Sequence, residues 1–128
     1  MQKIFNYIDG ELLEPNSNQY LDNYEPSTAQ VYSKIPDSDS SDVEDAVKAA
    51  KKAFPIWSKM TKDKRSAILY RISELIEENL DELAEAESRD NGKPVSLAKK
   101  VDIPRAAHNF RFFATAILHY ASESHYME

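Results

Sequence analysis

The feature that most constrains the fold is an apolar stripe in the stretch 101–120, VDIPRAAHNFRFFATAILHY. Apolar residues recur there at spacings of three and four, which places them on one face of an α-helix. They are Ile103, Ala106, Ala107, Phe110, Phe113, Ala114, Ile117 and Leu118. We expect Asp102 to cap this helix and Pro104 to lie in its first turn, where the N–H groups have no intrahelical partner. Such a stripe must pack on another element, so the sequence predicts a helical layer.

A second face of the same helix carries polar and aromatic residues: Arg105, His108, Asn109 and Phe112. An arginine beside an apolar stripe is usually a solvated rim residue in a weak surface salt bridge. A guanidinium can also hold a carboxylate through two parallel, charge-assisted hydrogen bonds. From the residues alone, the rim interpretation of Arg105 is favoured over the binding one.

Composition and charge exclude several classes of function. The chain has 128 residues and a net charge of −6, with no basic patch, which disfavours nucleic acid and anionic membrane as partners. No apolar run approaches the roughly 20 residues of a membrane span. The start, MQKIFNYIDGELL, lacks the apolar core and cleavage site of a signal peptide. The absence of cysteine is compatible with the cytosol, and we expect a cytoplasmic location.

The chain also lacks the residues of several common active sites. Without cysteine it has no thiol nucleophile. Its two glycines, Gly10 and Gly92, are too far apart for a glycine-rich loop around a phosphate. The three histidines, His108, His119 and His125, lack the spacing of a zinc site. We therefore expect no catalytic residue, no cofactor-binding residue and no complete active site in this chain.

Residues 1–37 are expected to form a small antiparallel β unit. Strands are predicted at 5–8, 11–13, 20–24 and 31–35, where β-forming residues lie between turn signals. Asp9-Gly10 between the first two predicts a type I′ hairpin. Such a unit is marginal by itself, so it must pack on another element.

Residues 38–128 are expected to form a helical layer of four or five amphipathic helices. The first follows a predicted capping box from Ser41 to Glu44, in which each side chain satisfies a free N–H group. Pro55 is expected to end or kink this helix. Its apolar face is Val43, Ala46, Val47, Ala50 and Phe54.

The following helices are also predicted from their caps. Thr61 is expected to cap the second helix, and Asn79 to begin the third. Gly92 closes the third, because glycine adopts the left-handed cap conformation without a steric penalty. A short helix at 95–100 then leads into the stretch 101–120, so the fold class is α+β. The expected inward residues are Ile68, Leu69, Ile72, Leu75 and Ile76 in the second helix, and Leu80, Leu83 and Ala84 in the third.

Six sequence blocks, taken in order, resemble the N-terminal portion of NAD(P)-dependent aldehyde dehydrogenases. The blocks are IDGELLEP, NYEPSTAQVYSKIP, DVEDAVKAAKKAFPIWSKM, KRSAILYRISELIEEN, SRDNGKPV and FRFFA. The resemblance covers essentially the whole chain. The run DIPRAAHNFRFFA is most similar to the branch that acts on muconate-type semialdehydes, either 2-aminomuconate or 2-hydroxymuconate semialdehyde.

This resemblance implies a fold and an activity for a longer enzyme. The chain would be the N-terminal portion of the Rossmann-like α/β fold of that family. The complete enzyme would oxidise a carboxylate-bearing semialdehyde to the acid with NAD or NADP, as a homo-oligomer. The family's catalytic cysteine, general base and cofactor loop match positions beyond Glu128, so the chain alone is expected to be inactive and to bind no cofactor.

The resemblance also implies roles for three residues. Arg105 matches a position on the helix that lines the substrate tunnel, where an arginine resembles a carboxylate clamp, and Phe112 would form a wall of the tunnel. Asp90 matches an acid that helps to hold a structural alkali cation, together with backbone oxygens of Asn23-Tyr24. The alternatives are a packed phenylalanine for Phe112 and a helix-end residue for Asp90. After the turn Pro26-Ser27-Thr28, this chain has Ala29 where the family usually has glycine, and this difference counts against a tight turn there.

A second class of function stays open. The chain would then be a non-catalytic scaffold or binding module that associates with a full-length relative through its exposed helical stripes.

Overall fold

The structure is a computed structural model that describes residues 1–121. The chain divides into two compact units, which are taken one at a time below. Unit 1 comprises Met1–Lys59 and Ala86–Pro94, and unit 2 comprises Met60–Glu85 and Val95–Glu128. His125 lies outside the described residues. No helix in the described part has both the length and the apolar character that a membrane crossing needs.

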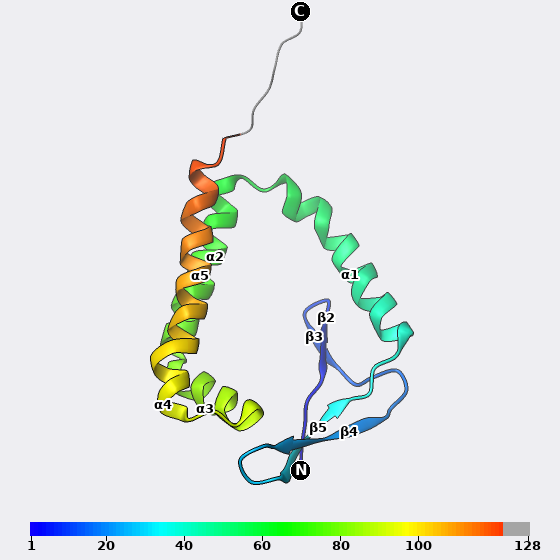
Figure 1. Ribbon diagram of the computed structural model, residues 1–128. Helices are drawn as coiled ribbons and strands as arrows, with labels where there is room; N and C mark the ends of the chain where they lie inside the picture. The colour runs from blue at the N-terminus through cyan, green and yellow to red at the C-terminus, as the bar shows by residue number, and fades with distance from the viewer. Residues whose placement is uncertain (122–128) are drawn as a thin grey trace, which may run out of the picture. The chain divides into compact units, whose positions relative to one another are not determined.

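The predicted order, a β unit followed by amphipathic helices, is confirmed (Figure 1). The strands are β1 (Gln2–Lys3), β2 (Asn6–Ile8), β3 (Glu11–Leu13), β4 (Tyr20–Glu25) and β5 (Gln30–Pro36). The helices are α1 (Ser40–Lys59), α2 (Lys62–Glu78), α3 (Leu80–Asn91), α4 (Val95–Leu97) and α5 (Ile103–His119), with a π-helical turn η1 (Ala98–Asp102) between α4 and α5.

Unit 1 contains two small sheets. Strands β2 and β3 form the predicted hairpin, with Asp9 and Gly10 both at positive φ (53° and 87°), as a type I′ turn requires. Strands β4 and β5 pair antiparallel, also as predicted. The sequence did not predict that β1 pairs parallel with β5, giving the order β1-β5-β4. A strand of two residues is too short to show the alternation that identifies a strand.

The β4–β5 turn is tight although it lacks glycine. The carbonyl of Glu25 accepts hydrogen bonds from the N–H groups of Thr28 (3.2 Å) and Ala29 (2.8 Å). Ala29 closes the turn with φ of 57°, in the left-handed region. An alanine there costs roughly 1–2 kcal/mol relative to a right-handed conformation. The turn therefore keeps its geometry at the expense of backbone strain.

Helix α1 begins earlier than predicted, so the expected capping box at Ser41 and Glu44 is wrong. Asp39 is the cap instead: its Oδ1 accepts the N–H of Ser41 (2.7 Å), and Oδ2 of Asp42 accepts the N–H of Asp39 (2.9 Å). Two aspartates can form the same reciprocal pair of hydrogen bonds as a serine and a glutamate. Here that pair lies two residues before the predicted one. The helix then continues through Pro55 to Lys59, so Pro55 does not end it, and the alternative expectation that it kinks the helix stays a prediction.

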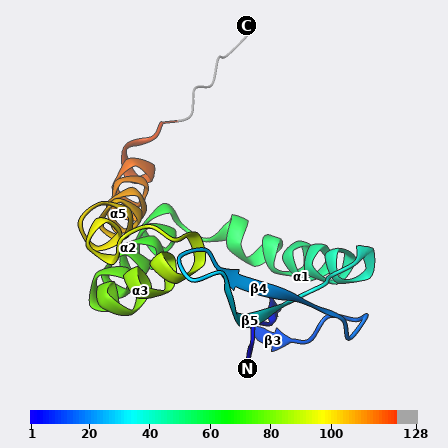
Figure 2. The same ribbon diagram turned by 60° about the horizontal axis from the view of Figure 1, so that its bottom comes forward.

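Unit 2 is built on the packing of α2 against α5, which lie side by side (Figures 1 and 2). Helix α2 starts at the predicted cap, where Thr61 Oγ1 accepts the N–H of Lys64. The buried residues along this contact include four small residues, spaced by seven in each helix, which share one helix face. They are Ser66 and Ser73 in α2, and Ala107 and Ala114 in α5.

This packing corrects the predicted stripes. Ile68 and Leu75 are 40% and 42% exposed, and Phe113, expected in the core, is 62% exposed. Small side chains let two helix backbones approach closely, so the bulky residues lie on the flanks of the contact instead of at its centre. The helical spacing of the apolar residues was predicted correctly, but the predicted inward face was not the one at the centre of the contact between the two helices.

A second buried cluster joins α3 to the start of α5. It consists of Ala84, Ala98 and Ile103, with Ile76 and Leu80 packed against it. Helix α3 begins where predicted, but the Asn79 side chain donates to the Leu75 carbonyl (2.8 Å) and so closes α2.

The predicted cap at Asp102 is wrong, because Asp102 is helical (φ −72°, ψ −51°) and its side chain makes no capping hydrogen bond. Instead the N–H of Ile103 bonds to the carbonyl of Ala98, five residues back. At 100° per residue, a regular α-helix would turn Ala98 and Ile103 about 140° apart. The wider turn lets both enter one cluster. Pro104 favours it, since a proline ring clashes with the carbonyl four residues back in a regular helix.

We predict that Ala29→Gly stabilises the chain by about 0.5–1 kcal/mol. Relief of the left-handed strain, roughly 1–2 kcal/mol, exceeds the entropy that glycine adds to the unfolded state, about 0.4–1 kcal/mol. Urea unfolding followed by circular dichroism measures the change. The control is Ala67→Gly on the exposed side of α2, which should destabilise by about 1 kcal/mol. A loss of stability in Ala29→Gly would contradict the strain at this turn.

The buried face of α2 gives a second prediction. Ser73 is fully buried, and its hydroxyl has no hydrogen-bond partner among the described residues. Ser73→Ala should therefore raise the free energy of unfolding by about 1 kcal/mol, since a buried unpaired hydroxyl is costly and alanine is the better helix former. Ser66→Ala on the same face is the matched control, and its gain should be smaller because Ser66 keeps some exposure (9%). Equal gains would show that the unpaired hydroxyl is not the cause.

Candidate functional site

Helix α5 presents one polar and aromatic face that its packing on α2 leaves free. Arg105, Asn109 and Phe112 follow at spacings of four and three, so they lie on one side of the helix, with His108 beside them. The rise of 1.5 Å per residue puts Arg105 and Phe112 about 10 Å apart along the helix axis. All four are exposed in the described chain, and Phe112 is 56% exposed. The structure thus brings the two predicted substrate residues onto one accessible face.

Two arginines of α5 differ sharply in their contacts. Arg111 donates to both carboxylate oxygens of Glu77, at 3.0 and 2.7 Å, and its guanidinium lies 5.3 Å from the centre of the Tyr70 ring. These hydrogen bonds hold the pKa of Glu77 below its ordinary value and raise the pKa of Arg111. Arg111 is therefore a structural residue that ties α5 to α2.

Arg105 forms no ion pair with any residue in the part of the chain that the structure describes. The surface salt bridge that the rim interpretation required is thus not found among these residues. The backbone at Arg105 is nevertheless well fixed, because Ile103 is buried and Pro104 has a restricted φ. An exposed guanidinium on a fixed backbone can bind a carboxylate by donating two parallel hydrogen bonds to its oxygens.

Phe112 and Phe113 contact each other edge to face, with ring centres 5.2 Å apart and planes at 84°. Beside them, a shallow hollow of about 250 Å³ lies between α2 and α5. Its lining residues are Leu69, Asn109, Phe110 and Phe113. The hollow offers apolar contact and no nucleophile, so it can hold carbon chains or rings but cannot by itself perform chemistry.

Asp90, the predicted cation ligand, lies near the end of α3 in unit 1. Its Oδ1 accepts a hydrogen bond from the Tyr32 hydroxyl (3.1 Å). Within residues 1–121, no group of three or more histidine, cysteine, aspartate or glutamate side chains is arranged to hold a metal ion. A ligand role for Asp90 stays a prediction.

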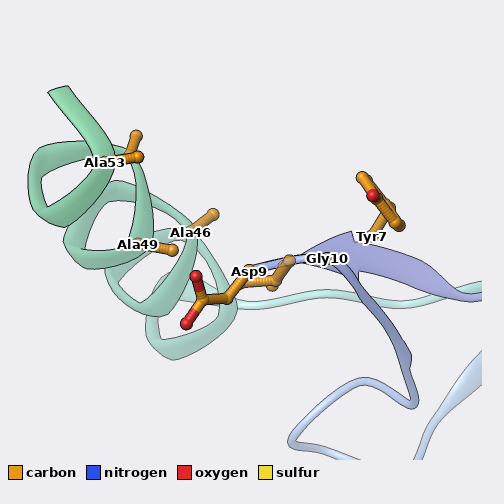
Figure 3. A pocket seen from close by; sticks show the side chains of 8 residues that line it. Tyr7, Asp9, Gly10, Ala46, Ala49 and Ala53 are labelled. Atoms are coloured by element: carbon orange, nitrogen blue, oxygen red, sulfur yellow. The ribbon is translucent and has the colours of Figure 1, made fainter. Parts of the chain in front are cut away.

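Unit 1 has a hollow of its own, of about 350 Å³, between the β2–β3 hairpin and α1 (Figure 3). Asp9 at the hairpin tip forms an ion pair with Lys52 of α1 (3.1 Å). The hollow has small apolar walls and holds no nucleophile. Its helical wall is Ala46, Ala49, Ala50 and Ala53. The sequence reasoning missed this hollow, although the run of alanines at helical spacing was a usable signal.

The sequence reasoning also missed a buried carboxylate that ties α1 to the β unit. Asp42 is 5% exposed and accepts hydrogen bonds from the Asn16 N–H (3.0 Å), the Asn6 side-chain amide (3.5 Å) and the Asp39 N–H. Three donors on one carboxylate explain how a charged group can be buried there. Its contacts make it a structural residue and not part of a reactive site.

Comparisons with known proteins agree with this geometry. The model of the aldehyde dehydrogenase family matches residues 12–128. The 2-aminomuconic semialdehyde dehydrogenase of Bos taurus is 50% identical over 123 residues, which are 96% of this chain and 25% of that protein. The Homo sapiens protein of the same name is 47% identical over 123 residues, with the same coverage. This chain therefore spans about a quarter of the length of these relatives.

A solved structure supports the same assignment. The indole-3-acetaldehyde dehydrogenase in complex with NAD⁺ superposes with a TM-score of 0.94 at 31% identity, over 100% of this chain and 26% of that one. This confirms the expected place of the chain in the Rossmann-like fold of such enzymes. Because the family model covers nearly all of its residues, the chain belongs to the aldehyde dehydrogenase family.

Proposed function

We propose that this chain is the N-terminal segment of an NAD(P)-dependent dehydrogenase that oxidises a carboxylate-bearing semialdehyde, and that Arg105 binds the substrate carboxylate. The observation that carries the proposal is the exposed Arg105 guanidinium, which forms no ion pair with residues 1–121 and lies on the same accessible face as Phe112. Support comes from the 50% identity to a 2-aminomuconic semialdehyde dehydrogenase. We further propose that the complete enzyme is a cytoplasmic homo-oligomer.

The described residues contribute binding and orientation. Arg105 would form two parallel hydrogen bonds to the carboxylate, fixing one end of the substrate. Phe112, two helical turns further on, would provide an apolar surface for the unsaturated carbon chain. Two fixed contacts restrict both the position and the rotation of the substrate, which lowers the entropic part of the barrier.

The described residues do not fit the cofactor. The chain has only two glycines, far apart in sequence, and thus no glycine-rich loop that would let backbone N–H groups surround a pyrophosphate. It also contains no cysteine to serve as a nucleophile. We therefore assign neither NAD(P) binding nor the chemical step to any residue of this chain.

A second candidate function is favoured by the exposed apolar side chains. Val43, Phe54 and Ile56 of α1 are 60–69% exposed, and Phe113 of α5 is 62% exposed. Exposed apolar surface of this kind commonly marks a protein interface. The chain would then be a non-catalytic module that associates with a full-length relative.

The two candidates give different results when the purified chain is mixed with the Bos taurus enzyme. We expect the chain alone to oxidise no semialdehyde, because it lacks a thiol, with NADH absorbance as the measurement. We also expect the mixture to elute as two separate species, with the activity of the full-length enzyme unchanged. Stable co-elution with altered activity would support the module and count against the proposed function.

The role of Arg105 is tested in a full-length chimera, in which these residues replace the matching segment of the Bos taurus enzyme. Arg105→Ala should lower kcat/KM for the carboxylate-bearing semialdehyde roughly tenfold to a hundredfold, as expected from loss of charge-assisted hydrogen bonds. An aldehyde without a carboxylate should be oxidised as before. Arg105→Lys should recover part of the loss, since lysine offers a charge without the planar fork.

Lys100→Ala is the control for a change of surface charge one turn earlier, and it should affect neither substrate. Equal losses for both aldehydes in Arg105→Ala would mean that Arg105 supports the helix and does not bind substrate. No loss with either aldehyde would leave it as a rim residue.

A further inference from the structure

The carboxylate of Asp90 ends a continuous chain of hydrogen bonds in unit 1. The Asn23 side-chain amide donates to Ser33 Oγ (3.1 Å) and to the Tyr32 hydroxyl (2.9 Å). The Tyr32 hydroxyl in turn donates to Asp90 Oδ1 (3.1 Å). Ser33 is fully buried, so the chain runs from the interior of the β4–β5 hairpin to the end of α3.

A β-bulge makes this chain possible. Consecutive residues of a strand normally point to opposite faces, so Tyr32 and Ser33 would not both reach Asn23. The register of β4 and β5 shifts here: Asn23 pairs with Ser33, but Tyr24 pairs with Val31. Tyr32 is thus the extra residue, and a bulge re-aims side chains in this way.

The end of α3 also fits closely against the same hairpin. Gly92 has φ of 80°, and a Cβ atom added there would lie 3.1 Å from Cβ of Pro26. The Arg89 guanidinium lies 5.8 Å from the centre of the Tyr32 ring. Three contacts therefore join the end of α3 to the hairpin: the close approach of the Gly92 backbone to Pro26, the hydrogen bond between Tyr32 and Asp90, and the cation–π contact between Arg89 and Tyr32.

These groups do not fit an alkali cation at Asp90. Such a cation needs oxygen atoms with their lone pairs directed at it. Instead, the Tyr32 hydroxyl donates its O–H to the Asp90 carboxylate, and the Asn23 amide donates an N–H to the Tyr32 hydroxyl. The nearby Arg89 is itself a cation and would repel another.

We propose that Asp90 is the acceptor end of a latch, formed by Asn23, Tyr32, Ser33 and Asp90, which holds the end of α3 on the β4–β5 hairpin without any bound cation. The latch explains why a tyrosine occupies the bulge. It also gives Asp90 a role that the charge of the side chain does not require, since an amide oxygen can accept the same hydrogen bond.

Thermal unfolding of the whole chain in sodium, potassium and choline chloride at equal ionic strength tests the latch. Tyr32→Phe should lower Tm by about 3–6 °C, equally in all three salts, because it removes the hydrogen bond donated to Asp90 and the one accepted from Asn23. Tyr24→Phe, on the neighbouring strand and 56% exposed, is the matched control and should leave Tm unchanged. Asp90→Asn should keep most of the stability, and Asp90→Ala should not.

Hydrogen exchange provides a readout that does not depend on the global melt. In Tyr32→Phe, the amides at the end of α3 should exchange faster, among them the Gly92 N–H that bonds to the Ser88 carbonyl. The latch is wrong if Tyr32→Phe changes neither Tm nor this exchange. It is also wrong if sodium or potassium raises Tm above the value in choline and Asp90→Asn removes that rise, which is the result expected of a cation ligand.

Discussion

The close approach of α2 and α5 is the contact on which unit 2 depends. Its centre is made of Ser66 and Ser73 on one helix and Ala107 and Ala114 on the other, so few atoms separate the two backbones. Because small residues take the inner positions, the large ones are displaced to the flanks, where Phe112 and Phe113 are more than half exposed. Because Ala107 and Ala114 face α2, Arg105 lies on the opposite side of α5, away from the contact. The accessible face proposed to bind substrate is therefore a direct consequence of how the two helices pack.

Unit 1 is held together differently, by polar side chains at the junctions between its elements. Asp42 joins α1 to the β unit with two hydrogen bonds, from Asn6 and Asn16, and the chain from Ser33 to Asp90 joins the hairpin to the end of α3. Buried hydrogen bonds are directional, so they fix which elements meet and in what register. Buried apolar side chains are few in the described part of this unit, and the helical wall of its hollow beside α1 consists of alanines. Its stability should thus respond more to loss of single polar groups than to changes of apolar volume.

The sequence predicted best those features that depend on a few neighbouring residues. The hairpin at Asp9-Gly10, the cap at Thr61 and the left-handed Gly92 were all confirmed, since each depends on local backbone chemistry. Two predicted caps, at Ser41 and Asp102, were wrong although they are local. The remaining errors concern how elements pack on one another. Periodicity cannot show that Ser73, and not Ile68, is the centre of a stripe.

The wide turn before α5 follows from burial of Ala98 and Ile103 five residues apart, which becomes visible only once both are known to share a cluster. The face of α5 that carries Arg105 was predicted correctly, whereas only the structure could show that Arg105 forms no ion pair with the residues it describes.

The central claim is that the free face of α5 binds a substrate carboxylate through Arg105. A crystal structure of the full-length chimera with the carboxylate-bearing acid product tests it most directly. If Arg105 binds the carboxylate, two of its guanidinium nitrogens should each lie about 2.8 Å from one oxygen of the distal carboxylate, the geometry of a charge-assisted pair, with Phe112 against the carbon chain. A product carboxylate held by another group, with Arg105 directed into solvent or paired with an acidic residue of the enzyme, would contradict the account.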